Sequence, residues 1–196
     1  MNVEAACLRS CLLMLGGLQQ ERADASIVEG ARRGDPSALD ELVRRHQNRI
    51  YNLAYRMLRQ AEDAEDVTQE AFLKAFAALP RLKNDGAFRS WLCRIAANLC
   101  LMRLRSRPRC IELAEDATAD DTCSADCSDL DAWQVREAVA KLPPKYRLAV
   151  VAFYVEGRSY AEGARLAGVP VLTFKTRLYR ARKMLRDLLG NREHTP

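Results

Sequence analysis

The chain has 196 residues, of which 48% are hydrophobic and 29% are charged, and its formal net charge is +5. This composition is typical of a soluble protein that buries cores of modest size, and the lack of strand-type alternation favours helices. No segment approaches the roughly 18 apolar residues of a membrane span, which excludes a transmembrane protein and indicates a cytoplasmic one.

Residues 1–25 are predicted to be a poorly ordered N-terminal extension. The richest apolar stretch in it, ACLRSCLLMLGGL, is interrupted by Arg9. A secretory signal is disfavoured, because this stretch lacks a basic start and a clear small-residue cleavage site. Two readings stay open: a loose amphipathic arm, or an extension ahead of a true start at Met14.

Three helices are predicted over residues 26–109, and together they can enclose one core. The first begins after Asp35, a good N-cap that is followed by a proline at the first helical position. Its apolar residues recur at the spacing of one helical face: Leu39, Leu42, Val43, Ile50, Leu53, Ala54, Met57 and Leu58. The second helix is predicted over about 63–79 and the third over about 88–105, with a loop between them.

The second predicted helix carries an acidic ridge. Its polar residues are Glu62, Asp63, Glu65, Asp66, Gln69 and Glu70. No basic residue occurs from Gln60 to Leu73. Such a ridge would repel DNA, because both are negatively charged, and it suits a basic protein partner.

The third predicted helix has the opposite character. Its polar side and its end carry three basic groups and an amide: Arg89, Arg94, Asn98 and Arg103. Phe88 and Trp91 lie beside them, after a loop that contains Gly86. Basic groups next to aromatic rings suit single-stranded bases, which are held by stacking and by hydrogen bonds to their edges. The alternative is that both rings are core residues, and this reading is favoured for Trp91.

An acidic segment over residues 110–130 divides the chain. It has eight acids and no base from Ile111 to Asp131, and it is poor in large apolar groups. Such a segment cannot bury enough surface to order itself, so it is predicted to be a flexible linker. A second helical domain is predicted over residues 131–190. The predicted fold class is therefore all-α, with two small helical domains joined by a flexible acidic linker.

The second domain contains a helix-turn-helix pattern. Ser159 and Glu162 form a capping-box sequence at the start of a short helix, and Gly168 permits a tight turn into a longer one. The longer helix has a polar face of one sign: Thr173, Lys175, Thr176, Arg177, Arg180, Arg182, Lys183 and Arg186. Such a helix enters the DNA major groove, where basic groups read guanine edges or grip phosphates. A merely solvated face is disfavoured, because acidic partners for these cations are missing.

The sequence has seven cysteines, an odd number that argues against disulfides in a chain predicted to be intracellular. Cys93 and Cys100 are seven residues apart along a helix and are expected on one buried face. The other notable pairs are C-x-x-x-C sequences: Cys7 with Cys11, and Cys123 with Cys127. These pairs could bind zinc or form a redox pair, but they lie far apart in sequence, and no metal or other cofactor is predicted.

Three stretches carry a resemblance to a known family. They are DVTQEAFLKAF (66–76), FRSWLCRIAANL (88–99) and LPPKYRLAVVAFYVEGRSYAEGARLAGVPVLTFKTRLYRARKML (142–185). In this order and spacing they resemble the extracytoplasmic-function (ECF) sigma factors of bacterial RNA polymerase. The resemblance covers most of residues 35–189.

The resemblance implies a sigma region-two domain followed by a region-four domain. In that family the acidic helix docks on a coiled coil of the largest polymerase subunit. This assigns core binding to Asp63, Asp66, Gln69 and Glu70. Recognition and melting of the −10 element are assigned to Asn84, Asp85, Gly86, Phe88, Arg89, Asn98 and Arg103. Recognition of the −35 duplex is assigned to Thr173, Lys175, Thr176, Arg177, Arg180 and Arg182.

The resemblance also implies partners and shows departures. The implied partners are bacterial core RNA polymerase, promoter DNA and an anti-sigma factor, with no catalytic residue and no small-molecule substrate. Three positions depart from the family pattern: Gly163 replaces a large aliphatic residue, Leu172 a small one, and Met102 a frequent Asp. Gly163 would leave a gap and cost about 1 kcal/mol of helix stability. These departures bear on −35 binding more than on the fold.

Two other functions compete with this one. The last of the three stretches, taken alone, also resembles the output domains of response regulators. The chain could therefore be a helix-turn-helix regulator that acts without polymerase. That reading leaves the acidic ridge unexplained. A thiol-based metal or redox sensor depends on the cysteines alone. An ordinary regulator would bind duplex DNA unaided, and a metal protein would release zinc on thiol modification.

Overall fold

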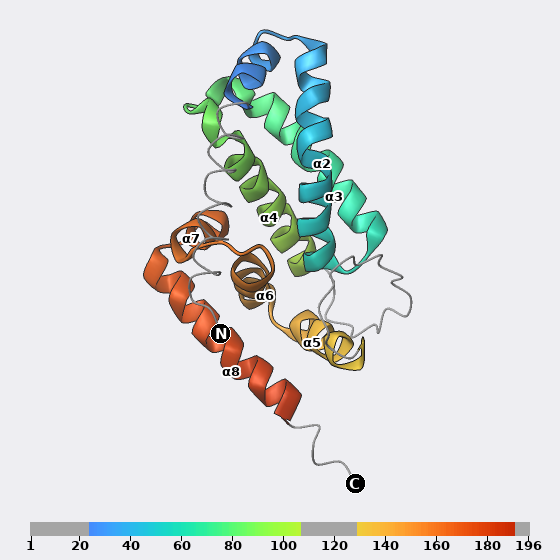
Figure 1. Cartoon of the computed structure of the whole chain (residues 1–196), viewed down its shortest axis with the longest axis vertical. Coiled ribbons are helices and arrows are strands. Elements are labelled where there is room, and N and C mark those ends of the chain that lie inside the picture. Colours follow the sequence, from blue (N-terminus) through green and yellow to red (C-terminus); the bar gives the residue numbers. More distant parts are fainter. Residues whose placement is uncertain (1–23, 107–128, 191–196) are drawn as a thin grey trace, which may run out of the picture.

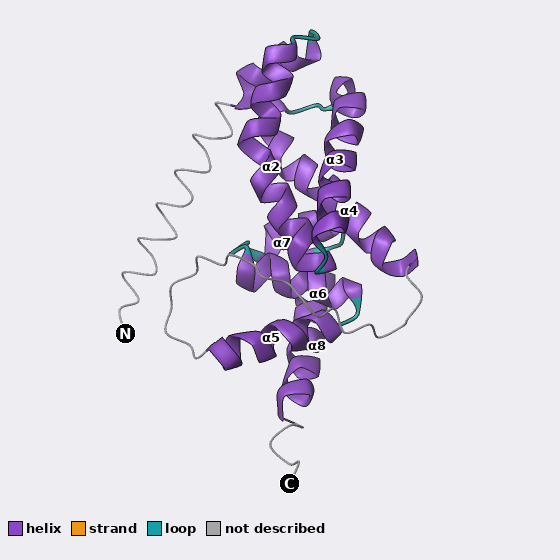
Figure 2. Ribbon diagram, turned by 90° about the vertical axis from the view of Figure 1, so that its right-hand side faces the viewer, coloured by secondary structure: helices purple, strands orange, loops and turns teal. Residues whose placement is uncertain are grey.

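The computed structural model describes residues 24–106 and 129–190, and every regular element in these two ranges is helical (Figure 1, Figure 2). After a helix over residues 24–32, the helices are α2 (Pro36–Leu58), α3 (Ala61–Ala78), α4 (Phe88–Ser106), α5 (Asp129–Lys141), α6 (Pro144–Val150), α7 (Tyr160–Ala167) and α8 (Val171–Gly190). Three short turns complete the order: η1 (Leu79–Arg81), η2 (Asp85–Ala87) and the π-helical η3 (Val151–Val155). The predicted all-α fold is confirmed. Not one of the helices described combines the length and the apolar character needed to cross a bilayer.

The first unit comprises α2, α3, α4 and the helix that precedes them. The side chain of Asp35 caps α2 by accepting a hydrogen bond from the backbone N–H of Ser37 at 3.0 Å, and Pro36 occupies the first helical position. The predicted second and third helices agree with α3 and α4 to within two residues at each end. Most of the predicted extension (1–25) and of the predicted linker (110–130) lies outside the described residues.

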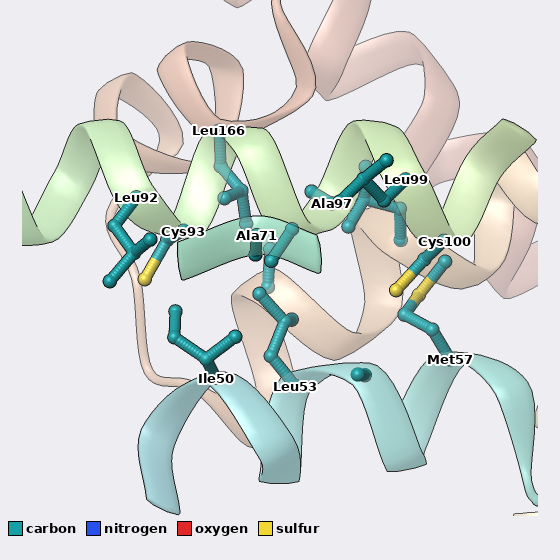
Figure 3. Packing of buried hydrophobic residues seen from close by; sticks show 14 of the residues in the cluster. Ile50, Leu53, Met57, Ala71, Leu92, Cys93, Ala97, Leu99, Cys100 and Leu166 are labelled. Carbon is teal, nitrogen blue, oxygen red and sulfur yellow. The ribbon is translucent and has the colours of Figure 1, made fainter. Parts of the chain in front are cut away.

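The core of the first unit lies between α2, α3 and α4. Ile50 and Met57 of α2 point toward Cys93 and Cys100 of α4 (Figure 3). Both cysteines are fully buried, as their spacing predicts. Burial raises the pKa of the Cys100 thiol to about 12, so this group stays protonated and unreactive at neutral pH.

The second unit comprises α5 to α8 with η3. The capping box predicted at the start of α7 is present: the Ser159 hydroxyl accepts from the Glu162 N–H at 3.3 Å, and the Glu162 carboxylate accepts from the Ser159 N–H at 2.9 Å. Gly168 ends α7 with φ 63°, a left-handed conformation that favours glycine. The chain then turns into α8, which completes the predicted helix-turn-helix.

The gap expected at Gly163 does not exist, so that expectation was wrong. A Cβ atom added to Gly163 would lie 2.3 Å from Cζ of Phe174, because the Phe174 ring occupies this space. The ring is fully buried. The glycine of α7 therefore lets a large ring of α8 pack beneath it.

The two units pack against each other, which the sequence did not predict. The buried apolar residues of both units form one continuous cluster, in which Leu166 of α7 points toward α4 (Figure 3). Arg147 of α6 is only 9% exposed, and its guanidinium donates to the carbonyl of Met57 in the last turn of α2 at 2.5 Å. It also donates to the carbonyls of Ala140 and Leu142. One arginine therefore joins the end of α2 to the turn before α6.

The π-helical turn η3 places an acid at the same interface. The N–H of Glu156 donates to the carbonyl of Val151 at 2.9 Å, five residues earlier, which is the π-helical spacing. The Glu156 side chain is 6% exposed and lies 2.9 Å from Arg56 and 3.7 Å from Arg49, both on α2. These contacts fix the second unit against the first.

Candidate nucleic-acid and protein interfaces

The outer side of α3 carries the acidic residues assigned to polymerase binding. Asp66, Gln69 and Glu70 are exposed, and Asp63 is half-buried. Asp66 and Glu70 follow Asp63 by three and seven residues, so the three carboxylates share one face of the helix. Glu70 also forms an ion pair with Lys74 at 2.7 Å.

An apolar pocket adjoins this acidic face. It has a volume of about 390 Å³, and it is lined by Val43, Gln47, Thr68, Gln69, Phe72, Leu73 and Phe76 of α2 and α3. Leu73 is 70% exposed at its edge. A pocket of this kind beside carboxylates suits a partner helix that presents both apolar and basic side chains. Leu73 was not predicted as a binding residue, although its position apart from the buried residues Val67, Ala71 and Ala75 of α3 is a signal of exposure.

Arg103 lies at the acidic face and not with the other residues assigned to the −10 element. Its Nε is 3.3 Å from Asp63 Oδ1, and its Nη2 is 3.0 Å from Asp66 Oδ2. Arg103 is five residues after Asn98, which separates the two side chains by roughly 140° around α4. Arg103 therefore offsets part of the acidic charge of α3 in this structure.

The loop before α4 is fixed by local contacts. The Asn84 side chain accepts from the Gly86 N–H at 3.1 Å and caps η2. Asp85 forms an ion pair with Arg32, whose guanidinium also donates to the carbonyl of Leu82 at 2.9 Å. The loop therefore presents Asn84 in an exposed, defined turn and ties Asp85 to the helix over residues 24–32.

Phe88 is fully buried, so its ring belongs to the core in this conformation. The ring centroid lies 5.6 Å from that of His46 and 6.2 Å from that of Trp91. Stacking on a base would require the Phe88 ring to leave this core. Asn98 is exposed on α4 and Arg89 is half-buried, so these side chains reach solvent where the ring of Phe88 does not.

The residues assigned to the −35 element lie along α8. Thr173, Lys175, Thr176, Arg180 and Arg182 are exposed, and Arg177 is half-buried. On the opposite side, Phe174, Leu178 and Ala181 are fully buried. The structure therefore brings the six residues together on the outer half of one helix.

Tyrosine side chains hold three of these basic groups. Lys175 Nζ lies 5.2 Å from the ring centroid of Tyr160, and the guanidinium of Arg182 lies 5.8 Å from that of Tyr154. A hydrogen bond with Arg180 lowers the pKa of the Tyr146 hydroxyl below its ordinary value.

The cysteine pairs Cys7/Cys11 and Cys123/Cys127 lie outside the described residues. Within residues 24–106 and 129–190, no group of three or more potential metal ligands comes together.

Family models match both units. The model for Sigma-70 region 2 matches residues 42–110, and the model for Sigma-70, region 4 matches residues 132–185. The ECF RNA polymerase sigma factor SigM of Mycobacterium tuberculosis is 39% identical over 177 residues, which cover 89% of this chain and 88% of that protein. The ECF sigma factor SigW of Bacillus subtilis is 30% identical over 180 residues, which cover 83% and 94%.

Solved structures are similar as well. CnrH in complex with the cytosolic domain of CnrY matches with a TM-score of 0.65 and 28% identity, and the match covers 86% of this chain and 98% of that one. The sigma factor RpoE of Bartonella quintana, in complex with the anti-sigma factor NepR, shows the same fold with a TM-score of 0.62 and 23% identity, covering 77% and 96%. The matches to both sigma regions and the identity over most of the chain support one conclusion: the chain belongs to the ECF sigma factors of bacterial RNA polymerase.

Proposed function

We propose that this sigma factor directs core RNA polymerase to promoters through three surfaces: the acidic side of α3, the exposed polar side of α4, and the outer half of α8. The observation that carries the proposal is the separation of charge. An acidic face with an apolar pocket lies on one unit, and a row of cations on a helix-turn-helix lies on the other. Sigma factors are not enzymes, so the chain supplies recognition to a polymerase whose active site lies elsewhere.

The α3 surface would bind core polymerase. Asp63, Asp66, Gln69 and Glu70 would pair with basic groups of a coiled coil, and an apolar side chain of that partner would enter the pocket beside Leu73. Asp66 is the most suitable anchor, because its side chain is 62% exposed, whereas that of Asp63 is 18% exposed.

The DNA contacts would be divided between the units. Asn84, Gly86, Arg89 and Asn98 would hold the opened −10 strand, and Asn98 would hold an extruded base. Asp85 and Phe88 would support this surface through the ion pair with Arg32 and the packing against Trp91. The six assigned residues of α8 would contact the −35 duplex.

An anti-sigma factor would be a further partner, and the cytoplasm the place of action. The Bartonella quintana RpoE was solved with the anti-sigma factor NepR, and CnrH was solved with the cytosolic domain of CnrY. Their similarity to this chain supports a similar partner here. Cytoplasmic location follows from the proposed partner, since bacterial core polymerase acts on the chromosome.

A charge reversal on α3 tests the polymerase surface. Asp66→Lys should abolish copurification with core polymerase, because it places a cation against the expected basic partner. Glu29→Lys makes the same change in charge at an exposed position of the helix over residues 24–32 and should leave copurification intact. Unchanged copurification of Asp66→Lys would contradict the docking assignment.

A truncation on α8 tests the DNA surface separately. Arg180→Ala should weaken run-off transcription from promoters that the wild-type holoenzyme uses, and it should leave core association unchanged. Arg33→Ala, at an exposed position of the first unit, is the matched control. Loss of core association together with transcription would contradict a role of Arg180 in DNA binding alone.

A further inference from the structure

The outermost line of α8 is largely apolar over the first half of the helix, although the sequence suggested a continuous basic face. Because Phe174, Leu178 and Ala181 are buried, the residues about half a helical turn away from them point furthest outward. Among the first nine residues of α8 these are Leu172, Thr176 and Tyr179, which we call the apolar crest; Lys183 follows one turn later on the same line. Leu172 is 76% exposed and Tyr179 is 70% exposed.

Basic residues flank the apolar crest on both sides. Lys175 and Arg182 lie on one side of it, and Arg177 and Arg180 lie on the other. The tyrosine rings beside Lys175 and Arg182 orient these cations without cancelling their charge. Two rows of cations along an outward-facing line match the two phosphate backbones that border a DNA groove.

The apolar crest would then face the base edges. The recognition helix of a helix-turn-helix contacts base edges with its N-terminal residues, and Leu172 is the second residue of α8. The Thr176 hydroxyl donates to the carbonyl of Leu172 at 3.0 Å, so its hydrogen is used within the helix. At this end of the helix the apolar crest therefore offers mainly carbon atoms to the groove, between the polar side chains that flank it.

The side chain of Leu172 has no polar atom, which restricts what it can recognise. In the major groove the four bases present hydrogen-bonding groups and one apolar group, the 5-methyl group of thymine. A leucine that cannot form hydrogen bonds discriminates between base pairs through this methyl group. The flanking cations favour a nucleic acid over a protein as the partner of the apolar crest.

We propose that Leu172 is a specificity-determining residue that packs against the 5-methyl group of a thymine in the −35 duplex. The inference depends on the proposed function, because it specifies what the α8 surface recognises.

Removal of the methyl group from the DNA tests the contact directly. Duplexes retained by the wild-type holoenzyme are selected from a random −35 library, and each thymine of the selected sequence is replaced in turn by deoxyuridine. For wild-type protein, one such replacement should weaken binding roughly fourfold, which is the effect of burying one methyl-sized group. For Leu172→Ala the same replacement should have no effect, and Leu172→Met should retain the discrimination.

Met184→Ala is the matched control, because Met184 is a partly exposed apolar residue of the same helix, three turns further on. This variant should discriminate thymine from deoxyuridine as the wild type does. The inference is overturned if no thymine replacement affects wild-type protein, or if Leu172→Ala and wild type lose the same factor. A holoenzyme that retains no duplex at all would instead contradict the proposed function.

Discussion

Several basic side chains of the first unit pair with carboxylates, whereas several of the second unit lie against carbonyl groups and aromatic rings; Arg158, 3.6 Å from Glu156, is an exception in the second. In the first unit, Arg103 contacts two aspartates of α3, and Lys74 pairs with Glu70. In the second, Arg147 donates to three carbonyls, and Lys175 lies against a tyrosine ring.

This difference decides how much charge each surface keeps. A carboxylate partner cancels the charge of a cation, but a carbonyl or a ring only orients it. The acidic face of α3 is therefore partly offset, whereas α8 keeps its positive charge in a fixed arrangement. The second unit in turn depends on a few specific contacts, which substitutions can break one at a time.

The largest effect is expected at Arg147. Arg147→Ala should lower the free energy of unfolding by about 3 kcal/mol, because it leaves buried carbonyls of both units without a donor. Urea denaturation of the full chain measures this value. Arg44→Ala, which breaks an exposed pair with Glu41 in the first unit, should cost less than about 1 kcal/mol. Equal losses would remove the distinction between the units.

A smaller loss is expected at Gly163. Gly163→Ala should destabilise by about 2 kcal/mol, although alanine favours a helix, because its Cβ would clash with the Phe174 ring. Thermal unfolding gives the difference, and adding Phe174→Leu should recover most of it. At Gly30 of the first unit an added Cβ would lie 3.2 Å from the Cβ of Ala38 and 3.8 Å from Asp35 Oδ2, so Gly30→Ala should cost much less. Stabilisation by Gly163→Ala would show that the ring yields easily.

The smallest effect is the pH dependence of the capping box. Its hydrogen bonds from Ser159 hold the pKa of Glu162 below the ordinary value of 4.5. The box therefore contributes fully above pH 4.5, and its contribution is lost as the pH falls through the lower folded-state value. Glu162→Gln should remove this part of the acid sensitivity, at a cost below about 1 kcal/mol at pH 7. An unchanged acid transition would contradict the assignment.

Local features of the fold could be predicted from the sequence. The caps at Asp35 and Ser159 are present, and α3 and α4 begin and end within two residues of the predicted limits. These features depend on neighbouring residues, so spacing alone reveals them. The family could also be predicted, and the comparisons confirm it. The roles assigned to single residues stay predictions.

Contacts between distant parts of the chain could not be predicted. Arg147 and Met57 are 90 residues apart, and Arg56 and Glu156 are 100 apart, so no local pattern links them. The burial of Phe88 and the ring of Phe174 beneath Gly163 likewise depend on packing between helices. Tyr179 was missed, and Leu172 was noted only as a departure from the family pattern, because the basic residues between them dominated the sequence of this helix.

The turn at Val151–Val155 acts as a one-residue insertion in an otherwise regular helix. Each residue of an α-helix turns the chain by about 100°. The additional residue therefore sets the direction in which the side chains that follow it point, and with it the direction of the chain toward α7. Deleting one residue there would restore the regular winding and rotate Glu156 away from Arg49 and Arg56. The attachment of the DNA-binding half to the rest of the protein is therefore set by chain length as much as by side-chain chemistry.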